Sequence, residues 1–421
     1  MQKVIDSGVP WIGCIPSDWE CKKGKYILKY VQKPVKPDDG VITCFRDGQV
    51  TLRSNRREDG FTMADKEIGY QGIDIGDLVV HGMDGFAGAI GVSDSRGKAS
   101  PVLNVLDTEM NKRYVMYYLR SVAYGNVFLA LATGIRVRSC DLRWNKLAEL
   151  LYPVPPIGAQ DRIVKYLDRK CSKIDGLRAN IQSEIDTLEE YRQSIIAESV
   201  THGLNEKVAL KNSGVAWCPK IPKHWTVVNP KGLFSLRTER AFPGDKQLTA
   251  SQEHGVVFQD EYMELTGNRI VTVLKDFSIL KHVEPNDFVI SMRSFQGGLE
   301  YSENRGCISS AYVMLVPNEK YVYAPFYRWF FKSSKYINAL QSTSNLVRDG
   351  QAMRYANFVQ IPLFIIPKEE QIAIAHYLDN RVGKIDRVLS VKKDQLKVLE
   401  EYKRSIIYEC VTGKREVPNE A

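Results

Sequence analysis

The sequence lacks the features that would place a protein in a membrane or in an oxidising compartment. No apolar run approaches the roughly 18 residues that a membrane-spanning helix needs, and no signal peptide is recognisable. The eight cysteines form no CxxC pair and have no histidine at zinc-ligand spacing, and the six histidines are scattered. We therefore expect a soluble cytoplasmic protein with free thiols, no metal site and no membrane partner.

The sequence also lacks the motifs of common nucleotide-dependent and methyl-transferring enzymes. It has no Walker GxxxxGK[ST] loop and no N-P-P-[YF]-like methyltransferase loop, and the nearest string, Tyr152 to Pro156, is typical of a linker. A nuclease-like E-x-K triplet at Glu401 to Lys403 lies inside a repeated helical segment, which argues against a catalytic role. The sequence therefore predicts no catalytic residue and a chain that is not an enzyme.

The chain does have the length and apolar content of two or three globular domains, together with a basic excess. It has 421 residues, of which 44% are hydrophobic and 10% aromatic, and its formal net charge is +8. A basic balance suits a polyanion such as nucleic acid, although many basic proteins bind nothing acidic.

One long polar segment occurs twice. The first copy spans residues 159–203, the second starts at Glu370, and identical residues recur between them at a constant offset of 211. Because these identities share one register, the two segments are copies of one element rather than unrelated surface helices. In the first copy they are Gln160, Leu167, Asp168, Lys173, Ile174, Asp175, Leu188, Glu189, Glu190, Tyr191, Ser194, Ile195, Ile196, Val200 and Thr201.

Apolar residues in both copies follow a seven-residue period, which is typical of a coiled-coil helix. Roughly 40 residues at 1.5 Å per residue make a rod on the order of 60 Å long. Lys392 interrupts the second series. Since neither helix can bury its apolar stripe alone, we expect the copies to pair with each other. The pairing residues would be Leu167, Ile174, Ile181, Leu188, Ile195, Leu378, Ile385, Leu399 and Ile406.

A shorter repeat opens each half of the chain. The string S-G-V-x-W, followed by I-P-x-x-W, begins at Ser7 and again at Ser213. The blocks that follow alternate apolar residues with Gly, Asp and Asn turns, which predicts short strands, with helices near residues 114–120 and 325–332. We therefore predict an α+β fold in four parts: a first domain (1–156), a long helix (157–204), a second domain (205–367), and a second long helix with a C-terminal tail (368–421).

The whole pattern resembles the specificity subunit of type I restriction–modification systems. The resemblance is carried by five kinds of string. They are the S-G-V-x-W…I-P-x-x-W strings that open each half, the Q-x-x-I or Q-I-A helix starts, the K-I-D string, the L-E-E-Y string and the S-I-I-x-E-x-V-T helix ends. It covers essentially the full chain. One departure is Ala159, which stands where the second copy has Glu370, and which we expect to weaken a helix cap.

The resemblance implies two target recognition domains in tandem, each followed by a conserved helix. The two helices would pair as an antiparallel coiled coil with pseudo-twofold symmetry, and would act as a ruler between half-sites. The chain would be a DNA-binding subunit that reads an asymmetric bipartite target on double-stranded DNA. Its implied partners are two methyltransferase subunits, which bind S-adenosylmethionine and methylate adenine, and restriction–translocase subunits where the complex also cleaves DNA. No cofactor is expected in this chain.

Polar residues on glycine-rich loops of the two blocks are the candidates for DNA contact. Lys and Arg bind phosphates, and Arg, Asn, Gln, Asp or Glu read base edges. An isolated surface arginine is as often simply solvated, so the clusters carry this prediction. The first block offers Arg46, Gln49, Arg53, Asn55, Arg56, Arg57, His81, Asp84, Arg96, Lys98, Arg136 and Arg138. The second offers Arg237, Arg240, Gln252, Arg293, Gln296, Arg348 and Gln351.

Two alternatives stay open at this point. The chain would keep the same fold if its partner were a single polypeptide in which methylase and nuclease are fused. It would have another function if the paired helices formed a scaffold for protein assembly that binds no DNA.

Overall fold

A computed structural model describes residues 3–56, 67–130, 142–270, 272, 277–291, 294–343 and 354–418. The chain divides into two compact units. The first unit comprises Met1–Gln182 and Asp394–Ala421, and the second comprises Ser183–Lys393. Each unit therefore holds one of the two blocks together with parts of both long helices.

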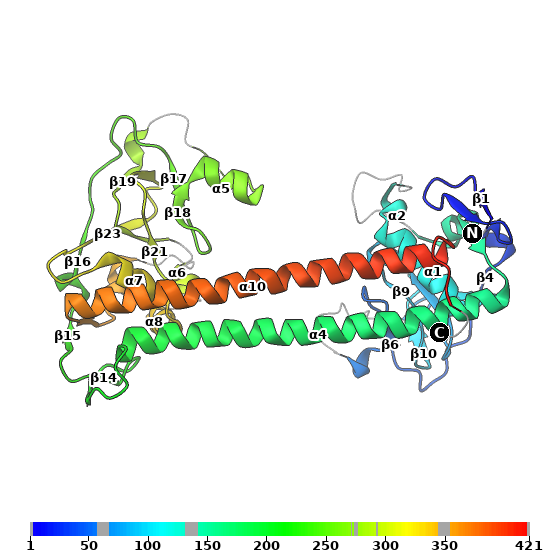
Figure 1. The fold of residues 1–421 in the computed structure, drawn as a ribbon, viewed down its shortest axis with the longest axis horizontal. Helices are drawn as coiled ribbons and strands as arrows, with labels where there is room; N and C mark the ends of the chain where they lie inside the picture. Colours follow the sequence, from blue (N-terminus) through cyan, green and yellow to red (C-terminus); the bar gives the residue numbers. More distant parts are fainter. Residues whose placement is uncertain are drawn as a thin grey trace. The chain divides into compact units, whose positions relative to one another are not determined.

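The first unit is built around a four-stranded antiparallel sheet of order β4-β11-β8-β9. Four antiparallel strand pairs, β1–β2, β3–β12, β5–β6 and β7–β10, and three short helices complete it (Figure 1). The strands are β1 (Val4–Asp6), β2 (Cys14–Pro16), β3 (Glu20–Lys23), β4 (Lys29–Tyr30), β5 (Ile42–Cys44), β6 (Val50–Leu52), β7 (Gln71–Ile73), β8 (Leu78–His81), β9 (Ile90–Val92), β10 (Gly97–Ala99), β11 (Leu103–Asp107) and β12 (Leu151–Val154). The helices are α1 (Lys112–Tyr124), α2 (Val127–Ala130) and α3 (Trp144–Glu149), with 3-10 turns η1 (Gly24–Tyr26), η2 (Arg53–Asn55) and η3 (Gly85–Ala87).

The second unit repeats this topology. Its four-stranded sheet has the equivalent order β16-β23-β20-β21, and its smaller pairs are β13–β14, β15–β24, β17–β18 and β19–β22. The strands are β13 (Leu210–Asn212), β14 (Lys220–Pro222), β15 (Thr226–Val228), β16 (Phe234–Leu236), β17 (Leu248–Ser251), β18 (Gly255–Phe258), β19 (Lys281–Val283), β20 (Phe288–Ile290), β21 (Glu300–Tyr301), β22 (Gly306–Ile308), β23 (Val313–Pro317) and β24 (Leu363–Ile365). The helices are α5 (Gln259–Thr266), α6 (Ser294–Gly297), α7 (Ala324–Phe330), α8 (Ser334–Ser342) and α9 (Tyr355–Phe358), with 3-10 turns η5 (Pro230–Gly232) and η6 (Phe277–Ile279). The predicted α+β fold with two domains of one topology is confirmed.

The turn that leads into the central strand of each sheet has the same construction. Gly76 and Asn286 both adopt a positive φ, of 85° and 75°, a conformation that favours glycine and asparagine. The aspartate that follows each of them accepts a backbone N–H three residues back, from Asp74 to Asp77 and from Glu284 to Asp287. Gly76-Asp77 and Asn286-Asp287 therefore form the same structural turn in the two blocks.

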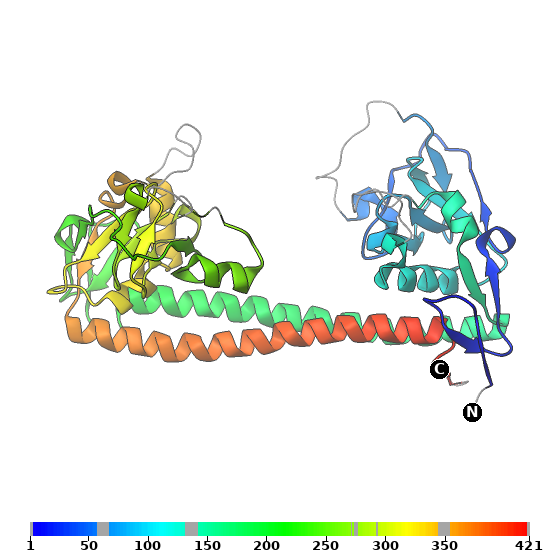
Figure 2. The same cartoon turned by 90° about the horizontal axis from the view of Figure 1, so that it is seen from above.

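Two long helices, α4 (Ile157–His202) and α10 (Lys368–Val411), run side by side in both ribbon views (Figures 1 and 2). Their direction is antiparallel within each unit. In the first unit Asp175 pairs with Lys403, while in the second Asp386 pairs with Arg192. The predicted antiparallel pairing of the two repeated helices is confirmed.

The buried residues of the helices follow alternating steps of three and four. Of the nine residues predicted to pair, Ile181, Leu188 and Leu399 are half-buried and the other six are buried. The seam also buries Ile185, Val382 and Leu389, which the strict seven-residue series omitted because it follows one of the two seam positions in each heptad.

Basic side chains occupy several positions on this seam, and each reaches a carboxylate on the opposite helix. The Lys403 ammonium lies 2.7 Å from Asp175, and Arg192 lies 2.8 Å from Asp386. These two pairs are equivalent in the repeat, because each joins the aspartate of a K-I-D string to the basic residue that follows L-E-E-Y. Lys392, which interrupts the apolar series, pairs with Glu184. The strings that carried the resemblance therefore encode the register of the helix pair.

The first residues of each long helix are fixed to the preceding block by a buried glutamine. Gln160 accepts the Asn111 backbone N–H at 2.9 Å and donates to the Pro155 carbonyl at 2.8 Å. Gln371 makes the same two kinds of bond, with the Tyr323 N–H and the Ile366 carbonyl, both at 2.8 Å. A repeated glutamine at a helix start thus satisfies backbone groups that burial would otherwise leave unpaired.

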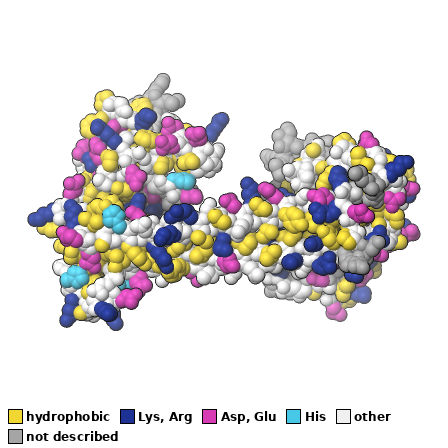
Figure 3. Space-filling model, in the orientation of Figure 1, with side chains coloured by type: hydrophobic (Ala, Val, Ile, Leu, Met, Phe, Trp, Pro, Cys, Tyr) yellow, Lys and Arg dark blue, Asp and Glu magenta, His cyan; other side chains and the backbone are white. Residues whose placement is uncertain are grey.

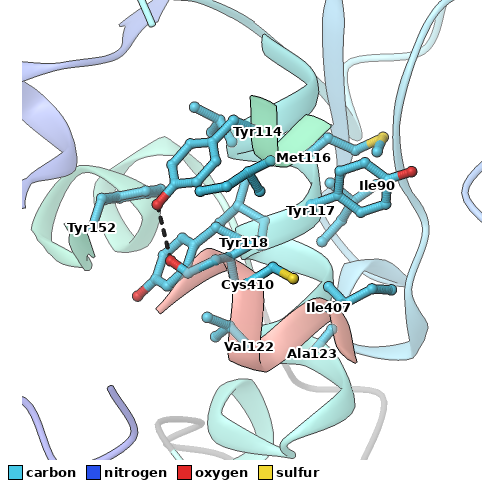
Figure 4. Packing of buried hydrophobic residues seen from close by; sticks show 14 of the residues in the cluster. Ile90, Tyr114, Met116, Tyr117, Tyr118, Val122, Ala123, Tyr152, Ile407 and Cys410 are labelled. Carbon is cyan, nitrogen blue, oxygen red and sulfur yellow. Dashed lines mark hydrogen bonds between the residues drawn. The ribbon is translucent and has the colours of Figure 1, made fainter. Parts of the chain in front are cut away.

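The core of the first unit is completed by the end of the chain. Ile406, Ile407, Cys410 and Val411 of α10 belong to the same buried cluster as the tyrosines of α1 (Figure 4). The Tyr114 hydroxyl donates to the Val411 carbonyl at 2.9 Å. The first block therefore buries its core only when residues almost 300 positions later have joined it.

The contacts of Glu370 with the I-P-x-x-W string of the second unit correct our interpretation of Ala159 and Glu370. Trp225, which is fully buried, donates its indole N–H to Glu370 at 3.0 Å, and His224 Nε2 lies 2.8 Å from the same oxygen. Gly203 adopts a φ of 77°, and a side chain there would collide with Glu370. Because the first copy has Ala159 at the position equivalent to Glu370, it lacks this tertiary contact with the I-P-x-x-W string. It also lacks the acidic residue in the first helical turn.

The charged seam predicts the outcome of a charge swap. Lys403→Asp should lower the free energy of unfolding by about 2 kcal/mol, because two carboxylates would then face each other on a partly desolvated seam. Adding Asp175→Lys should restore most of the loss, measured as the urea midpoint of unfolding by circular dichroism. Lys397→Asp, at an exposed position of the same helix, is the matched control. An equal loss in the single and the double variant would contradict the assigned register.

Candidate nucleic-acid interface

Five of the predicted DNA-contacting residues come together on one surface of the first unit. They line a hollow of about 620 Å³, together with Thr43, Phe45, Asp47, Ser100 and neighbouring strand residues. We call this the first-unit hollow. Strand β5 and the turn before β6 supply one side, η2 supplies another, and the end of β8 supplies the third. The five predicted residues are Arg46, Arg53, Arg56, His81 and Asp84.

Carboxylates hold the arginines of the first-unit hollow in place. Arg46 Nη2 donates to Asp84 Oδ1 at 2.9 Å, and Arg56 lies 2.7 Å from Asp47. The Arg56 guanidinium also stacks over the Phe45 ring, 4.2 Å from its centroid. Both arginines remain partly open to solvent, which is the state that an incoming anion or base edge requires.

His81 has a defined protonation pattern. Its Nδ1 accepts the backbone N–H groups of Met83 at 3.2 Å and Asp84 at 3.0 Å. A nitrogen that accepts cannot carry the proton, so the neutral ring is protonated at Nε2. Desolvation lowers the pKa of His81 from its usual value, so the ring is neutral near pH 7.

Two further predicted residues of the first unit are bound within the protein. Arg96 forms a two-point contact with the buried Asp39, at 2.8 and 3.0 Å, and another with Asp74 at 2.5 Å. Lys98 lies 2.7 Å from Glu67. Hydrogen bonds from Lys33 and Arg96 lower the pKa of Asp74 to about 2. These contacts give Arg96 a structural role in the block, and its contact with DNA stays a prediction.

The repeat supports the new role of Arg96. Its equivalent is Arg305, directly before β22, which lies 3.8 Å from Asp245 and 3.6 Å from Glu284. These acids are the equivalents of Asp39 and Asp74. Since the two blocks differ in their other polar loop residues, a network that recurs in both serves the common fold.

Gln49 and Asn55 are exposed and are not among the residues that line the first-unit hollow. The Asn55 amide donates to the Thr51 hydroxyl at 3.0 Å.

In the second unit, Arg237 is also structural. It donates twice to the buried Asp287, at 2.5 and 2.9 Å, and its side chain is only 14% exposed. Arg240 is exposed and donates to the Ile279 carbonyl at 2.9 Å. The prediction of a DNA contact thus fits the surroundings of Arg240 better than those of Arg237.

Gln252 and Gln296 line a different hollow, of about 710 Å³, which lies between the block and α4 within the second unit. We call this the second-unit hollow. Its floor contains Glu300, which is 1% exposed and accepts from Lys332 at 2.7 Å. Burial raises the pKa of Glu300 to about 7. Glu300, Phe45 and Thr43 also line these hollows but were not selected from the sequence. In the sequence, the strands are recognised only by their apolar residues and turns, and this pattern does not indicate which of their other residues line a hollow.

Six predicted residues lie outside the described part of the chain, so their positions are not discussed. They are Arg57, Arg136, Arg138, Arg293, Arg348 and Gln351.

Lys and Arg side chains are interspersed with Asp and Glu on the face of the molecule that Figure 3 shows. On that face basic and acidic side chains are mixed rather than separated into a single basic field. Local side-chain sets such as the first-unit hollow are therefore a better guide to binding than the overall charge.

Comparisons with known proteins add to this geometry. No protein-family model matches the chain. The chain is 25% identical to the putative type I restriction enzyme MjaX specificity subunit of Methanocaldococcus jannaschii, over 96% of this chain and 95% of that protein. The type I restriction enzyme MjaVIII specificity subunit of the same organism is 22% identical over the same shares. The chain resembles type I specificity subunits over its whole length.

A solved structure agrees with the fold. A chain from a study of complex assembly and conformational transition in the type I restriction–modification system matches with a TM-score of 0.69 and 13% identity, over 95% of this chain and 99% of that one. The predicted resemblance to type I specificity subunits is confirmed by the two relatives, and the predicted fold is confirmed by the solved structure. Among the described residues, no helix is both long and apolar enough to cross a membrane.

The structural role of Arg96 can be tested by stability. Arg96→Ala should lower the free energy of unfolding by about 3 kcal/mol, because it leaves the buried Asp39 without its cation. Arg46→Ala, which removes an exposed arginine of the first-unit hollow, should leave the urea midpoint unchanged. If Arg96→Ala kept the wild-type midpoint and lost DNA binding, the original assignment would hold.

The second-unit hollow predicts a pH dependence. The pKa of Glu300 is about 7 in the folded state and near 4.5 in the unfolded state. Between these two pH values the folded state binds the proton more tightly than the unfolded state does. The free energy of unfolding therefore falls as the pH rises from about 4.5 to 7. Glu300→Gln should remove up to roughly 3 kcal/mol of this dependence, seen as a flatter plot of melting temperature against pH. Glu253→Gln, at an exposed position in the same hollow, should leave the slope unchanged.

Proposed function

We propose that this chain is the DNA-reading specificity subunit of a type I restriction–modification complex, and that it recognises an asymmetric, bipartite target. One observation carries the proposal. Two units share a strand order, yet equivalent positions at the ends of their central strands carry different polar residues. His81 ends β8 and Asp84 comes three residues later, whereas Ser291 and Ser294 follow β20. Two DNA-binding units that share a fold but carry different contact residues would recognise two different half-sites.

The chemistry of methylation belongs, in this proposal, to partner subunits. In the string Tyr152 to Pro156, the nearest to a methyltransferase loop, the first three residues lie in strand β12 paired with β3, and the Tyr152 hydroxyl donates to the Leu147 carbonyl. These residues therefore have a structural role in the strand pair. Two methyltransferase subunits would bind S-adenosylmethionine and methylate adenine in each half-site, and restriction–translocase subunits would join where the system cleaves DNA.

The paired helices supply the proposed spacing element. Their length is set by the repeated heptads, and their register by the seam ion pairs. The same helices would suit a fused methylase–nuclease partner, which the size of the co-purified partner would distinguish. They would also suit a protein scaffold without DNA binding. The whole-length similarity to specificity subunits favours a DNA reader over that scaffold.

The proposal predicts a specific methylation pattern in the host. Deleting the gene should abolish adenine methylation at one gapped motif whose two half-sites differ, as read by modification-sensitive sequencing of genomic DNA. The purified chain alone should neither methylate nor cleave DNA, because it has no catalytic residues in this proposal.

A symmetric motif would contradict the two-reader argument. Unchanged methylation in the deletion strain, together with salt-independent failure of the assembled complex to bind duplex DNA, would favour the scaffold instead. Re-expression of the gene with Lys397→Asp serves as the matched control, since that exposed position should restore the motif.

A further inference from the structure

The polar groups of the first-unit hollow are unevenly divided between donors and acceptors. The guanidinium groups of Arg46, Arg53 and Arg56 can only donate hydrogen bonds. The two carboxylates present, Asp47 and Asp84, already accept from Arg56 and Arg46. A ligand that enters this hollow therefore meets mainly donors.

His81 adds to the donor side. Two backbone N–H groups occupy its Nδ1, which leaves Nε2–H as the polar group that the ring can present. Because burial keeps the ring neutral, His81 contributes a directional donor rather than a positive charge. The ring differs in this respect from the arginines beside it.

The edges of the four base pairs in the major groove distinguish among ligands for such a set. Guanine presents two acceptors, N7 and O6, side by side. Cytosine presents a donor, adenine an acceptor beside a donor, and thymine one acceptor beside a methyl group. A site rich in donors matches guanine, and arginine matches it with two parallel bonds.

Arg46 is the arginine best placed for this role. One of its five N–H donors is bound to Asp84, so the carboxylate orients the guanidinium while other donors stay available. Its side chain is 61% exposed at the rim of the hollow. Arg56, by contrast, is stacked on Phe45 and paired with Asp47, an arrangement that suits contact with the DNA backbone.

We infer that the first unit reads a guanine in its half-site through Arg46, with Asp84 as the positioning residue and His81 as an additional donor. This inference rests on the proposed function and adds the letter that one reader selects. Among the described residues the set does not recur in the second unit, where the Ser291 backbone N–H is bound to the Ser294 hydroxyl at 2.9 Å. The guanine contact through Arg46 is therefore assigned to the half-site that the first unit reads.

The test uses the assembled methyltransferase complex and duplexes that contain its mapped target. Each guanine of the target is replaced in turn by 7-deazaguanine, which removes the N7 acceptor and leaves base pairing intact. Wild type should lose roughly tenfold or more in affinity at one guanine of one half-site. Arg46→Ala should bind more weakly and become insensitive to that same replacement.

Two further variants separate base reading from simple charge. Arg46→Lys keeps the charge without the two-point contact, so it should also lose the sensitivity to 7-deazaguanine. Asp84→Asn should weaken discrimination at the same guanine, with the methylated motif relaxed at that position. Lys320→Ala, an exposed position of the second unit, should behave as wild type. Unchanged melting temperatures would show that all variants fold.

The outcomes are distinct. If Arg46→Ala weakened binding equally to every sequence and lowered the salt slope by about one, Arg46 would contact phosphate and the inference would be wrong. Two other outcomes would overturn the inference while the proposed function stands. In the first, Arg46→Ala keeps the sensitivity to 7-deazaguanine. In the second, the half-site bound by the first unit contains no G·C pair. Absence of any motif would overturn both.

Discussion

The pairing of each long helix with the opposite end of its copy is the constraint on which the rest of the structure depends. The first unit is closed by Ile406, Ile407 and Val411, which enter the core beside Tyr114. The second unit uses the start of α10, where Glu370 accepts from Trp225. Burial of these groups therefore stabilises the block and the helix together.

Charge on the helix seam gives that pairing its register. An apolar seam alone would tolerate a shift by one heptad, since each layer of Leu and Ile resembles the next. A seam that contains Arg192 and Lys403 does not, because a shifted helix would bury these cations away from Asp386 and Asp175. The ion pairs thereby define one alignment, at some cost in desolvation.

The two blocks show how one frame carries different surfaces. The network of Arg96 with Asp39 recurs as Arg305 with Asp245, and the turn aspartates Asp77 and Asp287 repeat each other's backbone bonds. The strand ends that border the first-unit hollow have diverged freely by comparison. Residues that hold the turns and strands are constrained by buried charge, whereas solvated loop residues are constrained only by the ligand they meet.

The sequence by itself determined the repeat, the two long helices and the α+β class, because periodicity and identical strings at one offset are local signals. It also gathered Arg46, Arg53 and Arg56 into one candidate set. Only the tertiary structure shows that Arg96 and Arg237 each pair with a buried aspartate from a loop or turn distant in the sequence. An arginine in a loop reads the same in the sequence whether its partner is an internal carboxylate or DNA.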